Sequence, residues 1–235
     1  MDMSSFLRAR ADHFPPSIDA RGFLEFGAPR MHYESRDSWS GTVSCCLDWR
    51  AELSLSALDA AAGAPDVVVG SVDFLLLRLG YEPAAQVLAL YGDQAEAFSE
   101  LFDGEWLAPD LDENDTLTAG MPISVALLVL DATVDDTVEA GDLRAWAVSQ
   151  VAYTMLPTTA GLLAMSSFAP PASEGRPARR LVSTDRVDPD WPRVGCISIP
   201  GHPQFFGQAT AYTYLDDARA SLDICREQTI RVPVV

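Results

Sequence analysis

Hydrophobic residues along this 235-residue chain show the spacing of buried strands in four main places. Partial alternation of apolar and polar residues is typical of a half-buried strand, and nearly continuous β-branched and leucine runs are typical of a central strand. Weaker apolar stretches near the C-terminal end predict three more strands. We therefore expect strands over residues 42–55, 67–79, 123–133 and 160–168, and then over 194–199, 209–215 and 229–235.

Two segments, residues 93–102 and 142–156, carry apolar residues at helical intervals instead, and each ends at residues that stop a helix. The second predicted helix lies between the strands at 123–133 and 160–168. These three elements predict a βαβ-like unit whose two strands are parallel neighbours in one sheet. The expected fold class is α/β, with a central mixed β-sheet flanked by helices.

The remaining segments are rich in turn-forming and polar residues. Proline and glycine interrupt residues 1–40, where we expect an irregular N-terminal arm with one short helix over 3–12. Residues 41–235 are expected to form a single domain. Residues 109–120 indicate an acidic loop, and residues 171–194 indicate a polar, proline-rich surface connection.

The net charge of −18 is concentrated in the middle of the chain. Residues 51–145 carry 19 acidic side chains against Arg78 and Arg144, which leaves this block at −17. Because such a field repels nucleic acid and anionic membranes, we expect neither as a partner. All 16 basic residues are arginines, and the absence of lysine excludes Schiff-base chemistry and a lysine-containing phosphate loop.

The cysteines and histidines predict reduced thiols and no metal site. The four cysteines, Cys45, Cys46, Cys196 and Cys225, show no CxxC spacing, and no apolar run has the length of a secretory signal or a membrane span. We therefore expect a cytoplasmic protein. The three histidines are far apart in sequence and lack the spacing of zinc ligands.

The central part of the chain resembles a known family. The runs ISVALLVLDATVDD, EAGDLRAWAVSQVAYTMLP and AGLLAMSSFAPP, within residues 122–171, are similar to the central motif of the GNAT superfamily of acyl-CoA-dependent N-acyltransferases. Upstream, VGSVDFLLLRLG and a helix ending in ELFDG resemble actinobacterial members, and ATAYTYLDDA resembles the tyrosine-bearing closing segment. The resemblance covers about residues 65–170 and implies a GNAT-type acyltransferase fold.

In that family, backbone N–H groups at a helix N-terminus hold the pyrophosphate of acetyl-CoA or another acyl-CoA. Aligning residues 143–146 (LRAW) with the family's Leu-Gly-Ala-Trp puts Glu139 at the motif's Arg/Gln position and Asp142 and Arg144 at its two glycines, so the motif is degenerate. A carboxylate about 4 Å from a phosphate costs on the order of 4 kcal/mol at an effective dielectric constant near 20. The resemblance assigns cofactor binding to Ala132, Thr133, Val134, Glu139, Ala140, Gly141, Asp142, Leu143 and Arg144.

The resemblance also implies catalytic residues. Family members often use a carboxylate on the central strands as general base and a tyrosine as general acid. By position, Asp131 near the end of its strand and Asp73 on the preceding strand are the candidate carboxylates, and Tyr214 in the closing segment is the candidate acid.

Three classes of function follow from these observations. The first is an acyl-CoA-dependent N-acyltransferase with an altered phosphate loop and a small cationic amine as acceptor, because the acidic block attracts cations. The second is a GNAT scaffold that uses another small molecule. The third is a non-catalytic scaffold that binds a protein partner. The sequence leaves the acyl group, the acceptor and the formation of a homodimer open.

Overall fold

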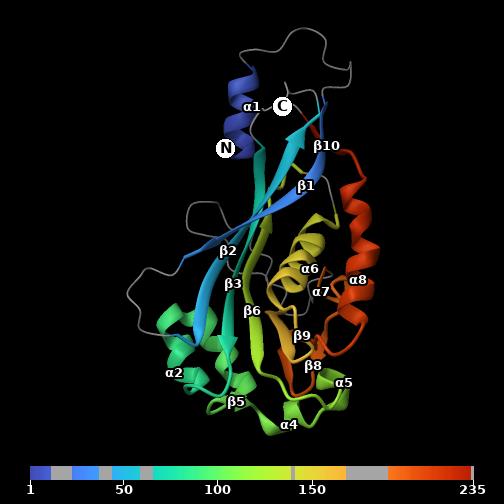
Figure 1. Ribbon diagram of the computed structural model, residues 1–235. Helices are drawn as coiled ribbons and strands as arrows, with labels where there is room; N and C mark the ends of the chain where they lie inside the picture. The colour runs from blue at the N-terminus through green and yellow to red at the C-terminus, as the bar shows by residue number, and fades with distance from the viewer. Residues whose placement is uncertain (12–22, 37–43, 59–65, 139–140, 168–189, 234–235) are drawn as a thin grey trace.

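One eight-stranded mixed sheet runs through the molecule (Figure 1). Its strands lie in the order β10-β1-β2-β3-β6-β7-β9-β8. This computed structural model describes residues 1–11, 23–36, 44–58, 66–138, 141–167 and 190–233. The strands are β1 (Phe23–Ser35), β2 (Cys46–Ala57), β3 (Val67–Arg78), β6 (Val125–Val134), β7 (Gly161–Ser166), β8 (Ile197–Ile199), β9 (His202–Ala209) and β10 (Ile230–Pro233).

The predicted βαβ unit is confirmed. Strands β6 and β7 are parallel neighbours, paired from Val125 opposite Gly161 to Val129 opposite Met165. Helix α6 (Leu143–Met155) connects them. The other strand pairs of this sheet are antiparallel in the part of the chain that the structure describes. The α/β fold class, with a large mixed sheet flanked by helices, is therefore confirmed.

Helices pack against both faces of the sheet (Figure 1). One face carries α6 and α8, and the other carries the group of short helices inserted between β3 and β6. Besides α6, the helices are α1 (Met3–Ala11), α2 (Ala84–Leu88), η1 (Ala89–Tyr91), α3 (Asp93–Glu96), η2 (Ala97–Leu101), α4 (Pro109–Asp112), α5 (Asp115–Thr118), α7 (Asp190–Arg193), α8 (Tyr214–Leu222) and η3 (Asp223–Arg226), and a small hairpin joins β4 (Phe102–Asp103) to β5 (Trp106–Leu107).

Side-chain alternation along β6 builds both cores. Leu127 and Val129 are buried in the cluster that includes Trp146 of α6. Ala126 and Leu128 are buried in the other cluster, with the short helices between β3 and β6. Because successive side chains of a strand point to opposite faces, a continuous apolar run such as that of β6 is what a strand covered on both faces requires.

Residues 23–35, which we expected to be irregular, form the long strand β1 between β10 and β2. The alternation that would have indicated a strand is broken by an irregularity between Gly27 and Arg30, where Ala28 has a φ of 48°. The helix expected over residues 3–12 is present as α1.

Two expectations for other segments are also wrong. Residues 109–120 hold the two short helices α4 and α5 rather than an acidic loop. The strand expected over residues 209–215 is absent, because β9 ends at Ala209 and α8 begins at Tyr214. Most of the predicted surface connection lies outside the described residues, and Asp190–Arg193 at its end form α7.

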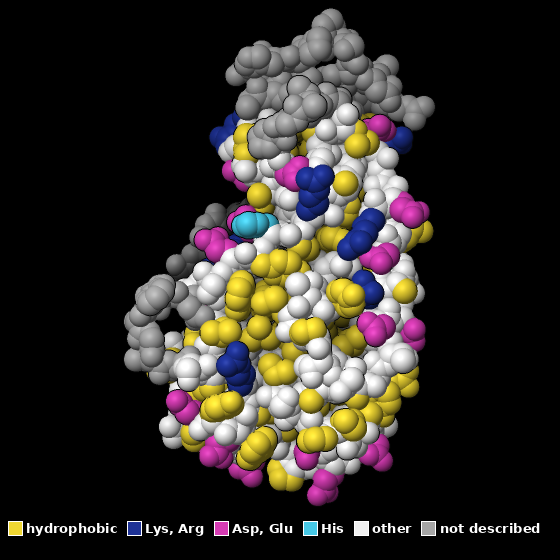
Figure 2. Space-filling model, viewed as in Figure 1, with side chains coloured by type: hydrophobic (Ala, Val, Ile, Leu, Met, Phe, Trp, Pro, Cys, Tyr) yellow, Lys and Arg dark blue, Asp and Glu magenta, His cyan; other side chains and the backbone are white. Residues whose placement is uncertain are grey.

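Charged side chains are unevenly distributed over the surface of the molecule. In Figure 2, acidic side chains lie mainly around the rim of the face, and the centre of that face is largely apolar. The four cysteines are free thiols, and all of them are buried. Among the described residues, no helix combines the length and the apolar character that a membrane-spanning helix requires.

Candidate functional site

The parallel strands β6 and β7 separate after a short paired stretch. Their pairing stops at Val129 and Met165. Beyond this point β6 continues beside β3 as far as Val134, whereas Ser166 of β7 pairs with Phe205 of β9. Among the residues that the structure describes, the last residues of β6 are therefore paired with β3 alone.

A bulge on β6 brings two predicted catalytic residues together at this separation. Asp131 lies opposite Asp73 of β3, but the next pair joins Phe74 to Val129, so Leu130 is the extra residue. The side-chain amide of Gln94 donates a hydrogen bond to the carbonyl of Leu130. Two carboxylates thus occupy facing positions on adjacent strands.

The two carboxylates differ in their surroundings. Asp73 Oδ1 lies 3.2 Å from Arg36 Nη1 and 3.7 Å from Arg50 Nε. Burial, and after it the negative charge of Asp73, raise the pKa of Asp131, although the backbone N–H of Ala132 and nearby arginines oppose this. A raised pKa moves the Asp131 carboxyl group toward the range in which a general acid or base operates.

The start of α6 is occupied by ion pairs. Asp142 precedes the helix, and its carbonyl accepts the first helical hydrogen bond from Trp146, at 2.8 Å. Its carboxylate makes no capping hydrogen bond and pairs with Arg193 Nη1 instead. Nε and Nη2 of Arg144 both lie 2.6 Å from Oδ2 of Asp190, whose side chain is 10% exposed.

An aromatic residue completes this cluster. The guanidinium of Arg144 lies 5.3 Å from the ring centroid of Trp191, and the indole N–H of Trp191 donates to the carbonyl of Ser166 at 2.8 Å. The end of β7, α7 and the start of α6 are thereby joined through paired polar groups. Breaking this set leaves charges in a partly buried environment.

The described residues of the predicted phosphate loop, Gly141 to Arg144, do not fit the diphosphate of coenzyme A. Both described cations at the start of α6 are ion-paired to carboxylates, and the carboxylate of Asp142 stands at the first turn, where the helix dipole would attract an anion. Gly141 has open space around its α-carbon, so no close backbone approach requires a glycine there. Glu139 and Ala140 lie outside the described residues.

The predicted cofactor residues on β6 belong to the sheet. Ala132, Thr133 and Val134 lie opposite Val72, Ser71 and Gly70 of β3.

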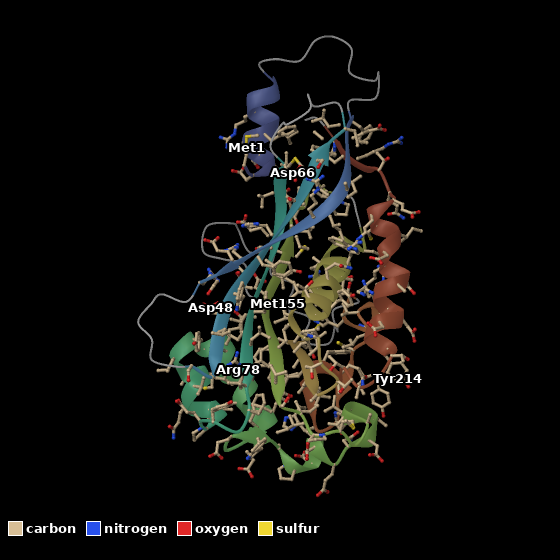
Figure 3. All side chains as sticks on the ribbon, viewed as in Figure 1. Met1, Asp48, Asp66, Arg78, Met155 and Tyr214 are labelled. Atoms are coloured by element: carbon tan, nitrogen blue, oxygen red, sulfur yellow. The ribbon has the colours of Figure 1, made fainter. Side chains whose placement is uncertain are left out.

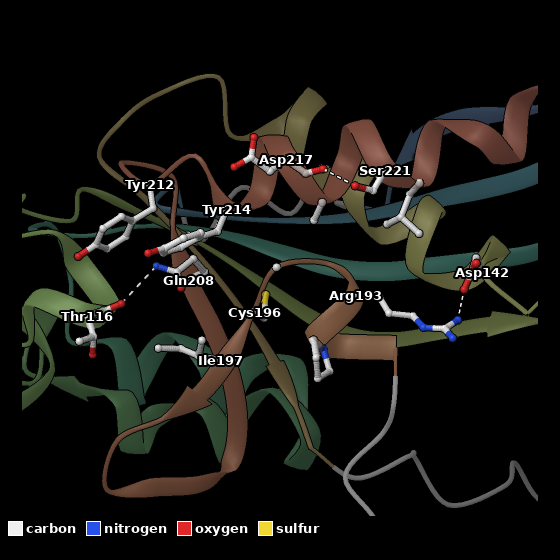
Figure 4. A pocket seen from close by; sticks show the side chains of 14 residues that line it. Thr116, Asp142, Arg193, Cys196, Ile197, Gln208, Tyr212, Tyr214, Asp217 and Ser221 are labelled. Atoms are coloured by element: carbon white, nitrogen blue, oxygen red, sulfur yellow. Dashed lines mark hydrogen bonds and ion pairs between the residues drawn. The ribbon is translucent and has the colours of Figure 1, made fainter.

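A cavity of about 890 Å³ lies beside α8, between that helix and the segment that leads from α7 into β8 (Figure 4). Volumes of 300–1,000 Å³ are typical of small-molecule sites. One stripe of α8 at helical spacing forms a wall. The residues that line the cavity are Thr116, Asp142, Pro192, Arg193, Gly195, Cys196, Ile197, Gln208, Tyr212, Tyr214, Asp217, Ala218, Ser221 and Leu222.

A close backbone contact between Gly195 and Tyr214 joins two parts of the cavity wall. Gly195 has a φ of +92°, and a Cβ built on it would lie 2.5 Å from the carbonyl oxygen of Tyr214. Only glycine combines this backbone conformation with that approach. The chain after α7 is therefore held directly against the start of α8.

Gln208 of β9 is a fully buried polar residue in the cavity wall. Its Nε2 lies 3.4 Å from the carbonyl oxygen of Thr116 and 3.3 Å from that of Leu117. These two acceptors require the amide nitrogen on their side. Oε1 of Gln208 is left buried without a hydrogen-bond partner among the described residues.

Tyr214, the third predicted catalytic residue, lies in this cavity, whose wall includes neither Asp73 nor Asp131. It lies where α8 begins, near α5 (Figures 1 and 3). Its ring stacks on that of Tyr212, with centroids 5.1 Å apart and planes at 24°. The Tyr212 hydroxyl donates to the carbonyl of Asp115, whereas Tyr214 is 53% exposed.

Sequence reasoning missed most of the cavity. Gln208, Arg193 and Cys196 belong to no motif, because the fold alone brings their segments together. Burial strongly raises the pKa of the Cys196 thiol, so this side chain stays protonated. The spacing of small and polar residues over 214–222 was the one available signal for the α8 wall.

Comparisons of the chain with protein-family models, with curated proteins and with solved structures find no match.

Proposed function

We propose that this protein is a GNAT-like scaffold that works without coenzyme A and binds, or acts on, another small molecule in the cavity beside α8. A parallel strand pair that separates around a connecting helix supports the GNAT-like part of this proposal. The cavity volume supports a small-molecule ligand.

The observation that carries the proposal is the pairing of charges at the start of α6. Arg144 forms an ion pair with Asp190, and Arg193 forms an ion pair with Asp142. A diphosphate bound there would have to displace a carboxylate from each arginine and lie against the carboxylate released. The gain from a helix N-terminus, at most about 2 kcal/mol, does not offset one such repulsion of about 4 kcal/mol.

The second candidate is an acyl-CoA-dependent N-acyltransferase acting on a small cationic amine. One observation favours it: Asp131 has a raised pKa and lies where β6 and β7 separate, opposite Asp73. A carboxylate of that kind suits the removal of a proton from an ammonium group.

Isothermal titration calorimetry with acetyl-CoA separates the two candidates. We expect no heat of binding at acetyl-CoA concentrations up to about 1 mM, which corresponds to a binding free energy weaker than about −4 kcal/mol. A dissociation constant in the micromolar range would overturn the proposal and establish the second candidate.

A further inference from the structure

The wall of the cavity beside α8 includes a residue with a buried acceptor that lacks a donor among the described residues. The carbonyl oxygens of Thr116 and Leu117 hold the Gln208 amide nitrogen, so its Oε1 is fixed on the opposite side. Buried polar groups in proteins are paired as a rule, so this unpaired acceptor is unusual. Because Oε1 has no accessible surface, a ligand in the cavity does not contact it directly, and the ligand class follows from the accessible groups of the wall.

Two aromatic rings, those of Tyr212 and Tyr214, lie in the cavity wall. Tyr212 and Tyr214 are stacked, and Tyr214 is about half exposed (Figure 4). Aromatic faces carry negative potential and bind flat rings and cations. Small side chains at Ala218 and Ser221 leave room along α8 behind this stack.

The charge of the wall is negative. Its charged members are Asp142, Arg193 and Asp217, and the first two form an ion pair. Asp217 accepts a hydrogen bond from the Thr213 hydroxyl and has no cationic partner among the described residues. The wall therefore carries one uncompensated carboxylate, in a chain whose net charge is −18. Such a field attracts cations and repels phosphates and carboxylates.

We infer that the cavity binds a small flat organic cation, of the aromatic amine or amidine class. The ring stacks on Tyr214, and the positive charge faces Asp217. This inference rests on the proposed function, because it names the ligand class of the same cavity.

Three probes of one shape test the ligand class by calorimetry on the full chain: benzamidine, which is a cation, benzamide, which is neutral, and benzoate, which is an anion. We expect benzamidine to bind at least about tenfold more tightly than benzamide, and benzoate to give no heat up to about 10 mM. Equal affinities for the three probes, or no heat from benzamidine at about 10 mM, would overturn the inference.

Variants locate the binding. We expect Tyr214→Ala and Asp217→Asn each to weaken the binding of benzamidine by about fivefold or more. The matched controls are Tyr81→Ala, whose ring is 67% exposed elsewhere, and Asp216→Asn, whose side chain lines a neighbouring cavity. Benzamidine affinity unchanged in both Tyr214→Ala and Asp217→Asn, or equally reduced in the controls, contradicts the assigned site.

The result of the acetyl-CoA titration is interpreted independently of the result with benzamidine. Failure of benzamidine binding, with no acetyl-CoA heat either, refutes the ligand class and leaves the independence from coenzyme A intact. Micromolar acetyl-CoA binding refutes the proposed function, whatever benzamidine does.

Discussion

The start of α6 and the cavity beside α8 are neighbouring regions that share Asp142 and Arg193. They differ in whether their polar side chains have hydrogen-bond or ion-pair partners. At the start of α6, each described charged side chain has an oppositely charged partner. In the cavity, Gln208 Oε1 and the Asp217 carboxylate lack a donor and a cation, respectively, among the described residues. Paired groups stabilise the fold, whereas unpaired groups beside an open volume can recognise a ligand.

The largest expected effect concerns the ion pair at the start of α6. Arg144→Ala removes the guanidinium that lies 2.6 Å from the mostly buried carboxylate of Asp190, so we expect the free energy of unfolding to fall by about 3 kcal/mol. Urea denaturation followed by circular dichroism measures this loss. Arg193→Ala is the matched control, because Arg193 and Asp142 are both about half exposed and their pair contributes no more than about 1 kcal/mol. Equal losses in the two variants would contradict a structural role specific to Arg144.

The next effect concerns the contact between Gly195 and Tyr214 in the cavity wall. Gly195→Ala places a Cβ against the Tyr214 carbonyl and forces a positive φ on alanine, and we expect a loss of about 2 kcal/mol in unfolding free energy. Gly141→Ala is the control, because nothing lies within 4 Å of its Cβ position, and we expect a change within about 0.5 kcal/mol. Thermal and urea denaturation of both variants test the difference. A Gly195→Ala protein as stable as the wild type would show that the two segments are not in contact.

The smallest effect concerns the carboxylate pair and depends on pH. The raised pKa of Asp131 means that the folded protein holds this proton to higher pH than the unfolded chain does. Ionisation of Asp131 therefore reduces stability as pH rises from about 4 through its folded pKa. We expect Asp131→Asn to be more stable than the wild type at pH 7, by no more than about 1 kcal/mol, and equally stable at low pH.

Asp73→Asn is the control for this pH dependence. It loses ion pairs with Arg36 and Arg50, so we expect a small destabilisation at pH 7, about 1 kcal/mol, because the side chains of both arginines are partly exposed, at 43% and 36%. Melting temperatures of both variants across pH 4–8 provide the measurement. A decrease in stability at pH 7 in Asp131→Asn would contradict the stated environment of Asp131.

The contrast between the two regions also shows what the sequence could predict. The β6–α6–β7 unit was predictable, because its apolar runs are long and residues that stop a helix follow α6. The strand expected over 209–215 was not correct. Apolar and polar residues alternate over this segment as in a strand, but β9 ends at Ala209 and α8 begins at Tyr214.

The candidate site was predictable only in its residue types. Asp73 and Asp131 were found, but their facing positions depend on the bulge at Leu130, which is a property of strand register in the folded sheet. Tyr214 was assigned to the same site, and α8 places it in a different cavity. Gln208 carries no local signal, since its role depends on the carbonyl groups of α5.

The central claim is that the cavity beside α8, and not the start of α6, is the small-molecule site. The most direct test is an NMR titration of the full chain with benzamidine and, separately, with acetyl-CoA, followed through backbone amide shifts. We predict that benzamidine shifts the amides of Cys196, Gln208 and Tyr214, and that acetyl-CoA leaves those of Leu143 and Arg144 unchanged. Saturable acetyl-CoA shifts at Leu143 and Arg144, with no benzamidine response in the cavity, would contradict the account.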